Sequence, residues 1–198
     1  MSIQVPYQKL PGGLTPVYKN KGDAGADIYN KEPIFVAPGQ TILVGTGLKV
    51  AIPEGYFIDM RPRSGISAKT MLRLANSPGT IDSGYRDEMG IIIQNLGFSN
   101  VWVDFVITID GKIERYENSM FLFPTYLIPA GTRLAQILLL KVEKMDFVEV
   151  DDVGVIGENR GGGFGSTGLF EHIENKEDKH EGKVEFIELS DSIDIKDN

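Results

Sequence analysis

The sequence contains no cysteine, and its apolar runs are short. The absence of cysteine excludes disulfides, thiolate metal sites and a cysteine nucleophile. Runs such as "ILLL" are far shorter than the roughly 20 apolar residues that a membrane-spanning helix needs. The first residues, "MSIQVPYQKLPGG", lack the charged region and apolar core of a signal peptide. We therefore expect a soluble cytoplasmic protein that does not bind membranes.

A general basic surface is also missing. The chain has 28 acidic and 20 basic residues, a net charge of −8. Residues 171–198 hold ten acidic and four basic side chains, which leaves 18 acidic and 16 basic ones in residues 1–170. A long nucleic acid needs many phosphate contacts, so we expect no nucleic-acid partner. A single small anion needs only a few cations and is not excluded.

The length and the 41% hydrophobic content predict one main domain with appendages. We place this domain at residues 1–170 and an acidic C-terminal extension at 171–198. The extension is charged and mostly unpatterned, which is typical of a flexible tail. Alternation in "KVEFIEL" leaves open a single docked strand.

Strand patterns dominate the main domain. Residues 33–63 give three short β-rich runs separated by "PGQ", "GTG" and "PEG", while "IIIQNLG" and "RLAQILLLKV" are two further apolar strands. One short helix is expected to begin near Ser64. This pattern favours an antiparallel barrel or jelly roll over a βαβ fold. Within residues 101–126, Asp110 and Gly111 predict a type I′ hairpin that leaves the barrel as a surface excursion.

Several polar stretches could carry chemistry. "RGGGFGSTG" at residues 160–168 contains G-x-G-x-x-G without a following strand–helix–strand unit, so it is either a linker or a strip that wraps a phosphorylated, ring-bearing ligand. "RPRSG" at 61–65 places cations at a helix start, where an anion or only water is expected. "DAGADIY" at 23–29 offers carboxylates for metal-bound water or for turns. Gln136, inside an apolar strand, needs a hydrogen-bond partner, by default a backbone group.

The order of five stretches is more informative than any one of them. "AGADIY", "PRSGISAK", "NSPGTIDSGYRDE", "RLAQILL" and "RGGGFGSTG" resemble, in sequence and order, the five motifs of the homotrimeric dUTPase family. The resemblance implies an all-β, jelly-roll-like antiparallel β-barrel subunit with one short helix. It also implies a homotrimer with shared active sites that hydrolyses dUTP to dUMP and pyrophosphate. The interval from Asp82 to Arg133 is about twice the family's usual spacing, so the 101–126 hairpin is an insertion.

The resemblance also assigns roles to single residues. Asp82 matches the catalytic aspartate that activates the water attacking the α-phosphorus; without the other motifs, a turn-capping aspartate is the simpler interpretation. Tyr85 matches the residue that packs against deoxyribose. Asn76, with Gly79 and Ile81, matches the segment that reads uracil and excludes the methyl group of thymine.

The remaining matches concern phosphates and metal. Asp27 matches the carboxylate that holds waters of a Mg²⁺ ion on the triphosphate, whereas Asp23 is interpreted as structural. The phosphate contacts are matched by Arg63, Ser64, Gly65 and Gln136. The closing arm, at about residues 157–168, is matched by Arg160, Phe164, Gly165, Ser166 and Thr167. In the arm, Phe164 would stack on uracil.

Two alternative functions remain at this stage. One is a dCTP deaminase-like enzyme on the same scaffold. The other is a nucleotide-dependent regulatory binding protein, with a protein partner at the 101–126 insertion. Asp82 favours an active enzyme over the regulatory protein, because a protein that only senses the nucleotide does not need a water-activating group.

Overall fold

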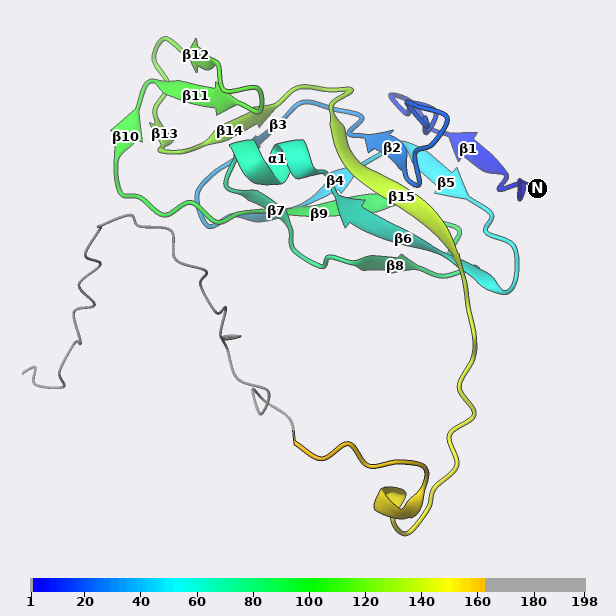
Figure 1. The fold of residues 1–198 in the computed structure, drawn as a ribbon. Coiled ribbons are helices and arrows are strands. Elements are labelled where there is room, and N and C mark those ends of the chain that lie inside the picture. Colours follow the sequence, from blue (N-terminus) through cyan, green and yellow to red (C-terminus); the bar gives the residue numbers. More distant parts are fainter. Residues whose placement is uncertain (1, 163–198) are drawn as a thin grey trace, which may run out of the picture. The chain divides into compact units, whose positions relative to one another are not determined.

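The computed structural model describes residues 2–162 and divides the chain into two compact units, Met1–Asp146 and Phe147–Asn198. The first unit consists of short strands and one short helix, so the expected all-β fold is confirmed (Figure 1). In the second unit, the described residues contain one 3₁₀ helix, η1 (Val153–Val155). No helix along residues 2–162 is long and apolar enough to cross a membrane.

Two sheets form the body of the first unit. One has the strand order β2-β15-β6-β8 and the other the order β4-β9-β7, and all their pairings are antiparallel. The bounds are β2 Ala26–Tyr29, β15 Arg133–Lys141, β6 Tyr56–Pro62, β8 Gly79–Ile81, β4 Thr41–Gly45, β9 Gly90–Asn95 and β7 Leu72–Leu74. Residues 33–63 contain four strands rather than the three runs expected, namely β3 (Ile34–Val36), β4, β5 (Leu48–Val50) and β6.

Smaller sheets complete the unit. Their orders are β1-β5, β10-β13 and β12-β11-β14-β3, and the β11–β14 pair is parallel. The bounds are β1 Tyr7–Lys9, β5 Leu48–Val50, β10 Trp102–Val103, β13 Phe121–Leu122, β12 Ile113–Arg115, β11 Phe105–Thr108, β14 Tyr126–Ile128 and β3 Ile34–Val36.

The core lies between the inner faces of the two main sheets. Alternate residues of β9 are buried, as expected for a strand with one face in the core, and Ile91 and Ile93 are fully covered. They belong to one apolar cluster with Ile28 of β2, Met60 of β6 and Leu134 of β15. Burial alternates along β9 although three isoleucines stand in a row, so packing against the other sheet decides which of them turn inward.

The expected short helix is present as α1 (Ser64–Lys69). It buries Ile66, and it ends where Thr70 turns back, with its hydroxyl donating to the carbonyl of Ile66 at 2.7 Å. The helix follows β6 directly, so the motif that begins at Arg63 lies at the end of a core strand.

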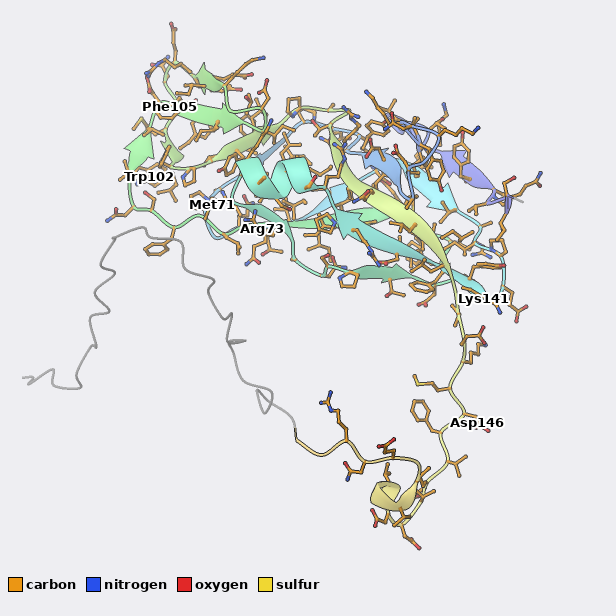
Figure 2. All side chains as sticks on the ribbon, in the orientation of Figure 1. Met71, Arg73, Trp102, Phe105, Lys141 and Asp146 are labelled. Atoms are coloured by element: carbon orange, nitrogen blue, oxygen red, sulfur yellow. The ribbon has the colours of Figure 1, made fainter. Side chains whose placement is uncertain are left out.

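The 101–126 insertion is more than the expected hairpin. The hairpin itself is β11–β12, but β11 also pairs with β14 of the body, and Val106 is fully buried. The outer part, β10–β13, carries Trp102, which is 59% exposed, whereas Phe105 is half-buried against Phe123 (Figure 2). The insertion is therefore anchored at its inner edge and exposed at its outer one.

The predicted type I′ turn at Asp110 is wrong. A type I′ turn needs positive φ at both central residues, but here only Gly111 has it, at +89°. The loop spans residues 109–111, and the N–H of Gly111 donates to the carbonyl of Thr108 at 2.8 Å. A three-residue loop with glycine in the left-handed region is the next commonest hairpin solution.

Asn30 connects β2 to the loop before β15. Its side-chain amide donates to the carbonyls of Glu32 at 2.7 Å and Pro129 at 2.9 Å, and its Oδ1 accepts from the N–H of Thr132 at 2.9 Å. The residue is fully buried. We expect Asn30→Ala to lower the free energy of unfolding by about 2–4 kcal/mol, because the carbonyl of Glu32 and the N–H of Thr132 lose their partner, while the carbonyl of Pro129 keeps only the hydroxyl of Thr132.

The measurement is urea unfolding at one fixed protein concentration, with exposed Asn100→Ala as the matched control. Equal midpoints for the two variants would show that Asn30 is not a structural link.

Candidate active site

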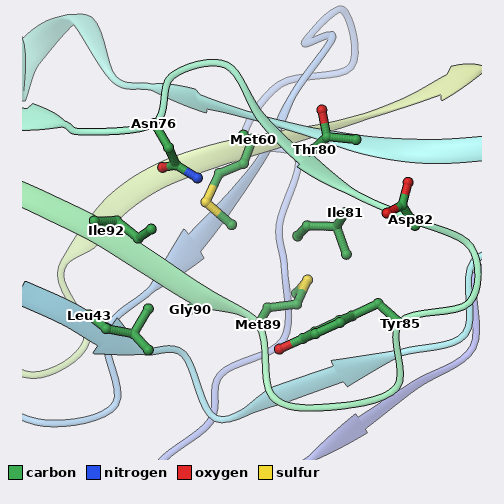
Figure 3. A pocket seen from close by; sticks show the side chains of 11 residues that line it. Leu43, Met60, Asn76, Thr80, Ile81, Asp82, Tyr85, Met89, Gly90 and Ile92 are labelled. Atoms are coloured by element: carbon green, nitrogen blue, oxygen red, sulfur yellow. The ribbon is translucent and has the colours of Figure 1, made fainter.

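A first pocket lies beside the stretch "GTIDSGYRDE" and has a volume of about 210 Å³ (Figure 3). One wall is β8, which is the last strand of its sheet, so its outer edge has no strand partner among the described residues. The unpaired N–H and C=O groups of an edge strand can pair with a ligand. The pocket is lined by Leu43, Met60, Asn76, Gly79, Thr80, Ile81, Asp82, Tyr85, Met89, Gly90 and Ile92.

Backbone forms the wall of this pocket because Gly79 has no side chain. A Cβ atom at Gly79 would lie 3.2 Å from Nδ2 of Asn76 and 3.5 Å from Cβ of Met60. The pocket brings together Asn76, Gly79 and Ile81, which the sequence predicted for uracil, and Tyr85, which it predicted for deoxyribose.

Tyr85 is held at both ends. Its N–H donates to the carbonyl of Asp82 at 3.1 Å, and its hydroxyl donates to the carbonyl of Glu88 at 2.8 Å. The ring lines the pocket and lies next to Met89, which is buried (Figure 3). A planar ring fixed in this way can shape the opening sterically.

Asp82 follows β8 immediately and is exposed. Its main-chain carbonyl closes the turn with Tyr85, but its carboxylate forms no hydrogen bond with another described residue. The simpler interpretation, a carboxylate that caps its own turn, therefore lacks support. A carboxylate of this kind can accept a proton from water.

A second pocket, of about 720 Å³, lies on the outer face of the β2-β15-β6 sheet. Four cationic and two anionic side chains line it, so its lining carries a net positive charge. It is lined by Lys19, Asn20, Asp23, Ala24, Gly25, Asp27, Arg61, Arg63, Ser64, Gly65, Arg133, Gln136 and Leu138. Such a surface favours a multiply charged anion.

Asp27 is at the centre of this pocket and is largely buried. Its Oδ1 lies 2.8 Å from Nε of Arg63, and its Oδ2 lies 3.4 Å from Nη1 of Arg133. Arg63 also donates through Nη1 to the carbonyl of Arg133 at 3.3 Å. The two guanidinium groups therefore flank one carboxylate.

Gln136 has the backbone partner expected of it. Its Nε2 donates to the carbonyl of Pro62 at 3.0 Å. A Cβ atom at Gly25 would lie 2.8 Å from Oε1 of Gln136, so a glycine at this position leaves the room that the amide occupies. Gln136 therefore lines the pocket while its amide is hydrogen-bonded to the carbonyl of Pro62.

Asp23 has the turn role expected for it. The backbone N–H of Asn20 donates to its carboxylate at 2.8 Å, and the amide of Asn20 lies within 3.3 Å. These hydrogen bonds hold the pKa of Asp23 below its usual value.

The predicted site residues of one chain fall into separate groups. The two pockets share no lining residue, so Asp82 lies in the first, while Asp27, Arg63, Ser64, Gly65 and Gln136 line the second. Arg160 belongs to the second unit and is exposed. The other predicted arm residues, Phe164, Gly165, Ser166 and Thr167, lie outside the described residues.

Some pocket residues were not predicted. Lys19 and Arg133 line the cationic pocket, and Met60 lines the smaller one. The motif "GTRLAQ" places Arg133 three residues before Gln136, which could have signalled it, but nothing in the sequence marks Lys19 or Met60. Among the described residues, no group of three or more His, Cys, Asp or Glu side chains could hold a metal ion directly.

A two-sheet β unit with a pocket beside an edge strand and a separate cationic pocket is suited to a class of protein that binds phosphorylated ligands. The sequence model of the dUTPase family matches residues 14–109. The deoxyuridine 5′-triphosphate nucleotidohydrolase of Picosynechococcus is 36% identical over 159 residues, which cover 80% of this chain and 93% of the relative. That of Corynebacterium diphtheriae is 39% identical over 166 residues, 83% and 93% of the two chains. The chain belongs to the dUTPase family, and its activity is the hydrolysis of dUTP to dUMP.

Solved structures agree with this assignment. The dUTPase of Staphylococcus bacteriophage 80alpha with dUpNHpp has a TM-score of 0.78 at 29% identity and covers 85% of this chain and 100% of its own. A mutant dUTPase of the S. aureus phage phi11, described with a structural Mg(II) ion, has a TM-score of 0.71 at 30% identity, with 77% and 99% covered. The family's jelly-roll-like β fold is therefore confirmed for this chain.

The contact between Gly25 and Gln136 can be tested directly. We expect Gly25→Ala to displace Gln136 and to weaken binding of dUpNHpp by about tenfold, the factor that corresponds to roughly 1.4 kcal/mol. Isothermal titration calorimetry measures this affinity. The matched control is Gly22→Ala, because a Cβ atom there has nothing within 4 Å. Unchanged affinity in Gly25→Ala would remove Gln136 from the binding site.

Proposed function

We propose that Asp82 is the general base of dUTP hydrolysis. It activates a water molecule that attacks the α-phosphorus, and the reaction releases dUMP and pyrophosphate. The observation that carries this proposal is the position of an exposed carboxylate directly after the edge strand of a base-sized pocket. A base must lie within hydrogen-bond reach of the water it deprotonates, and the exposed position of Asp82 beside the pocket supports this role.

Uracil and deoxyribose are selected in the same pocket. The free edge of β8, at Gly79 and Ile81, pairs with the uracil ring, and Asn76 completes the contact. Apolar side chains in the lining, among them Leu43, Met60 and Ile92, support selection by shape, because they would have to exclude an added methyl group sterically. Steric exclusion is needed because a polar cradle discriminates poorly against one methyl group. Tyr85 closes the sugar side of the pocket.

Each complete site draws on several copies of the chain in a homotrimer. Support comes from the separation of the two pockets within one chain, since neither contains all of the predicted residues. The first pocket of one subunit would face the cationic pocket of another. The arm of the third would then bring Arg160 to the phosphates, Phe164 to the uracil ring and Gly165, Ser166 and Thr167 to the closing edge.

Arg63, Ser64, Gly65 and Gln136 bind the phosphates, and Asp27 holds Mg²⁺ through water. A single carboxylate suits this outer-sphere arrangement, because Mg²⁺ keeps most of its waters. The net positive lining also suits a triphosphate that stays anionic after it binds a divalent ion. The ion would supply positive charge against the phosphates, and Arg63, which now pairs with Asp27, would bind a phosphate oxygen.

The reaction belongs in the cytoplasm, where it keeps uracil out of DNA and supplies dUMP for thymidylate synthesis.

We also propose that the 101–126 insertion offers a docking surface to a protein partner. Exposed Trp102 on β10 supports this second proposal. A species-specific insert is a feature of the phage phi11 enzyme as well.

The role of Asp82 is tested by pyrophosphate release. We expect Asp82→Asn to lower kcat by about 10²–10⁴-fold, the usual contribution of a general base. Asp87→Asn, an exposed carboxylate on the same hairpin, is the matched control and should keep wild-type kcat. Assays with dUTP, dTTP, dCTP and UTP measure selectivity in parallel. Wild-type turnover in Asp82→Asn would end the proposal.

The role of Asp27 is tested by a magnesium titration. We expect Asp27→Asn to raise the Mg²⁺ concentration for half-maximal rate by about tenfold or more, since a hydrogen bond to a charged group is worth about 1.5–3 kcal/mol. Binding of metal-free dUpNHpp should not weaken, because Arg63 loses its competing carboxylate. An unchanged magnesium requirement would show that Asp27 only holds the two arginines.

A further inference from the structure

A charged cluster lies at the far end of the hairpin that carries Asp82 and Tyr85. The Nζ atom of Lys31 lies 2.8 Å from Oε2 of Glu88, and the N–H of Gly47 donates to Oε1 of Glu88 at 2.8 Å. Lys31 follows β2 and Gly47 connects β4 to β5, so one carboxylate joins three distant parts of the chain. Both oxygens of Glu88 are therefore occupied by the body of the fold.

The chain leaves little room around this cluster. A Cβ atom at Gly45 would lie 2.6 Å from Oε1 of Glu88 and 2.8 Å from Cε of Lys31. Glycine at position 45 therefore allows the ion pair to pack against the end of β4. The ammonium of Lys31 lowers the pKa of Glu88, and the carboxylate raises the pKa of Lys31 in turn. Both groups are charged at neutral pH.

The main chain of Glu88 holds the ring of Tyr85. Its carbonyl accepts the Tyr85 hydroxyl at 2.8 Å, while the Tyr85 N–H donates to Asp82. The side chain of Glu88 is thus fixed to the body, and its carbonyl fixes the ring that shapes the pocket mouth. Figure 3 shows this ring next to Met89, the residue that follows Glu88.

We propose that Glu88 is a positioning residue for sugar selection, acting through Tyr85. The clamp formed by Lys31, Gly47 and Glu88 holds the ring where it leaves no space for a 2′-hydroxyl. This inference rests on the proposed role of Tyr85. It adds that the exclusion of ribonucleotides depends on an ion pair outside the residues that touch the nucleotide.

A competing explanation uses only the backbone. Met89 donates to the carbonyl of Leu48 at 2.8 Å, and its own carbonyl accepts the hydroxyl of Thr46 at 2.7 Å. If these two bonds fix the end of the hairpin by themselves, the ion pair contributes to stability and not to selection. The two explanations differ in the ratio of activities with dUTP and UTP.

The test compares kcat/KM for dUTP and UTP in Glu88→Ala, Glu88→Gln and Lys31→Met. We expect Glu88→Ala to lower the dUTP/UTP ratio by about three- to tenfold, the factor that one ordinary hydrogen bond represents. Glu88→Gln should recover part of the ratio, because its amide oxygen can still accept from Gly47. If Glu88→Ala does not fold, Lys31→Met removes the same ion pair and should lower the dUTP/UTP ratio as well.

Two controls separate the possible failures. Glu143→Ala removes an exposed ion pair with Lys141, also at 2.8 Å, and should leave the ratio unchanged. Tyr85→Ala tests the underlying role of the ring, so an unchanged ratio there would overturn the proposed function of Tyr85. A lowered ratio in Tyr85→Ala with wild-type ratios in Glu88→Ala and Lys31→Met would overturn only the clamp.

Discussion

The antiparallel pairing of β15 with β2 on one side and β6 on the other is the constraint on which the site depends. It places Gln136 opposite both Asp27 and Arg61, so three polar side chains form a row across one face of the sheet. A shift of β15 by one residue would turn Gln136 to the other face, away from Asp27 and Arg61. The apolar residues of β15 that fill the core prevent such a shift, so core packing fixes the chemistry of the outer face.

The larger pocket depends on strand pairing, whereas the smaller pocket depends on a strand edge that no other described strand pairs with, the outer edge of β8. Among the described strands, β8 pairs with β6 alone, so its other edge has no described strand partner. Exposed edges usually invite aggregation, but this one is only three residues long and is followed by a turn. The hairpin that continues from it is held at its far end by Glu88. A short, anchored edge can therefore offer backbone groups to a base without recruiting another strand.

Much of this arrangement could be predicted from the sequence. The two apolar strands β9 and β15 and the helix at Ser64 follow from residue patterns, and the ordered motifs identify the family. The turn at Gly111 was mispredicted because Asp-Gly favours a two-residue loop locally, whereas the register of β11 and β12 leaves three residues to connect. The parallel pairing of β11 with β14 had no local signal, since it depends on where the chain returns to the body.

The sequence alone determined which residue types are available and, through the ordered motifs, the class of reaction. It could not determine that Asp27 lies between the guanidinium groups of Arg63 and Arg133, which come from positions far apart in the chain. It also gave no sign that Lys31 reaches Glu88. Only the tertiary structure decides such contacts, because ion pairs between distant segments depend on the packing of strands and not on local spacing.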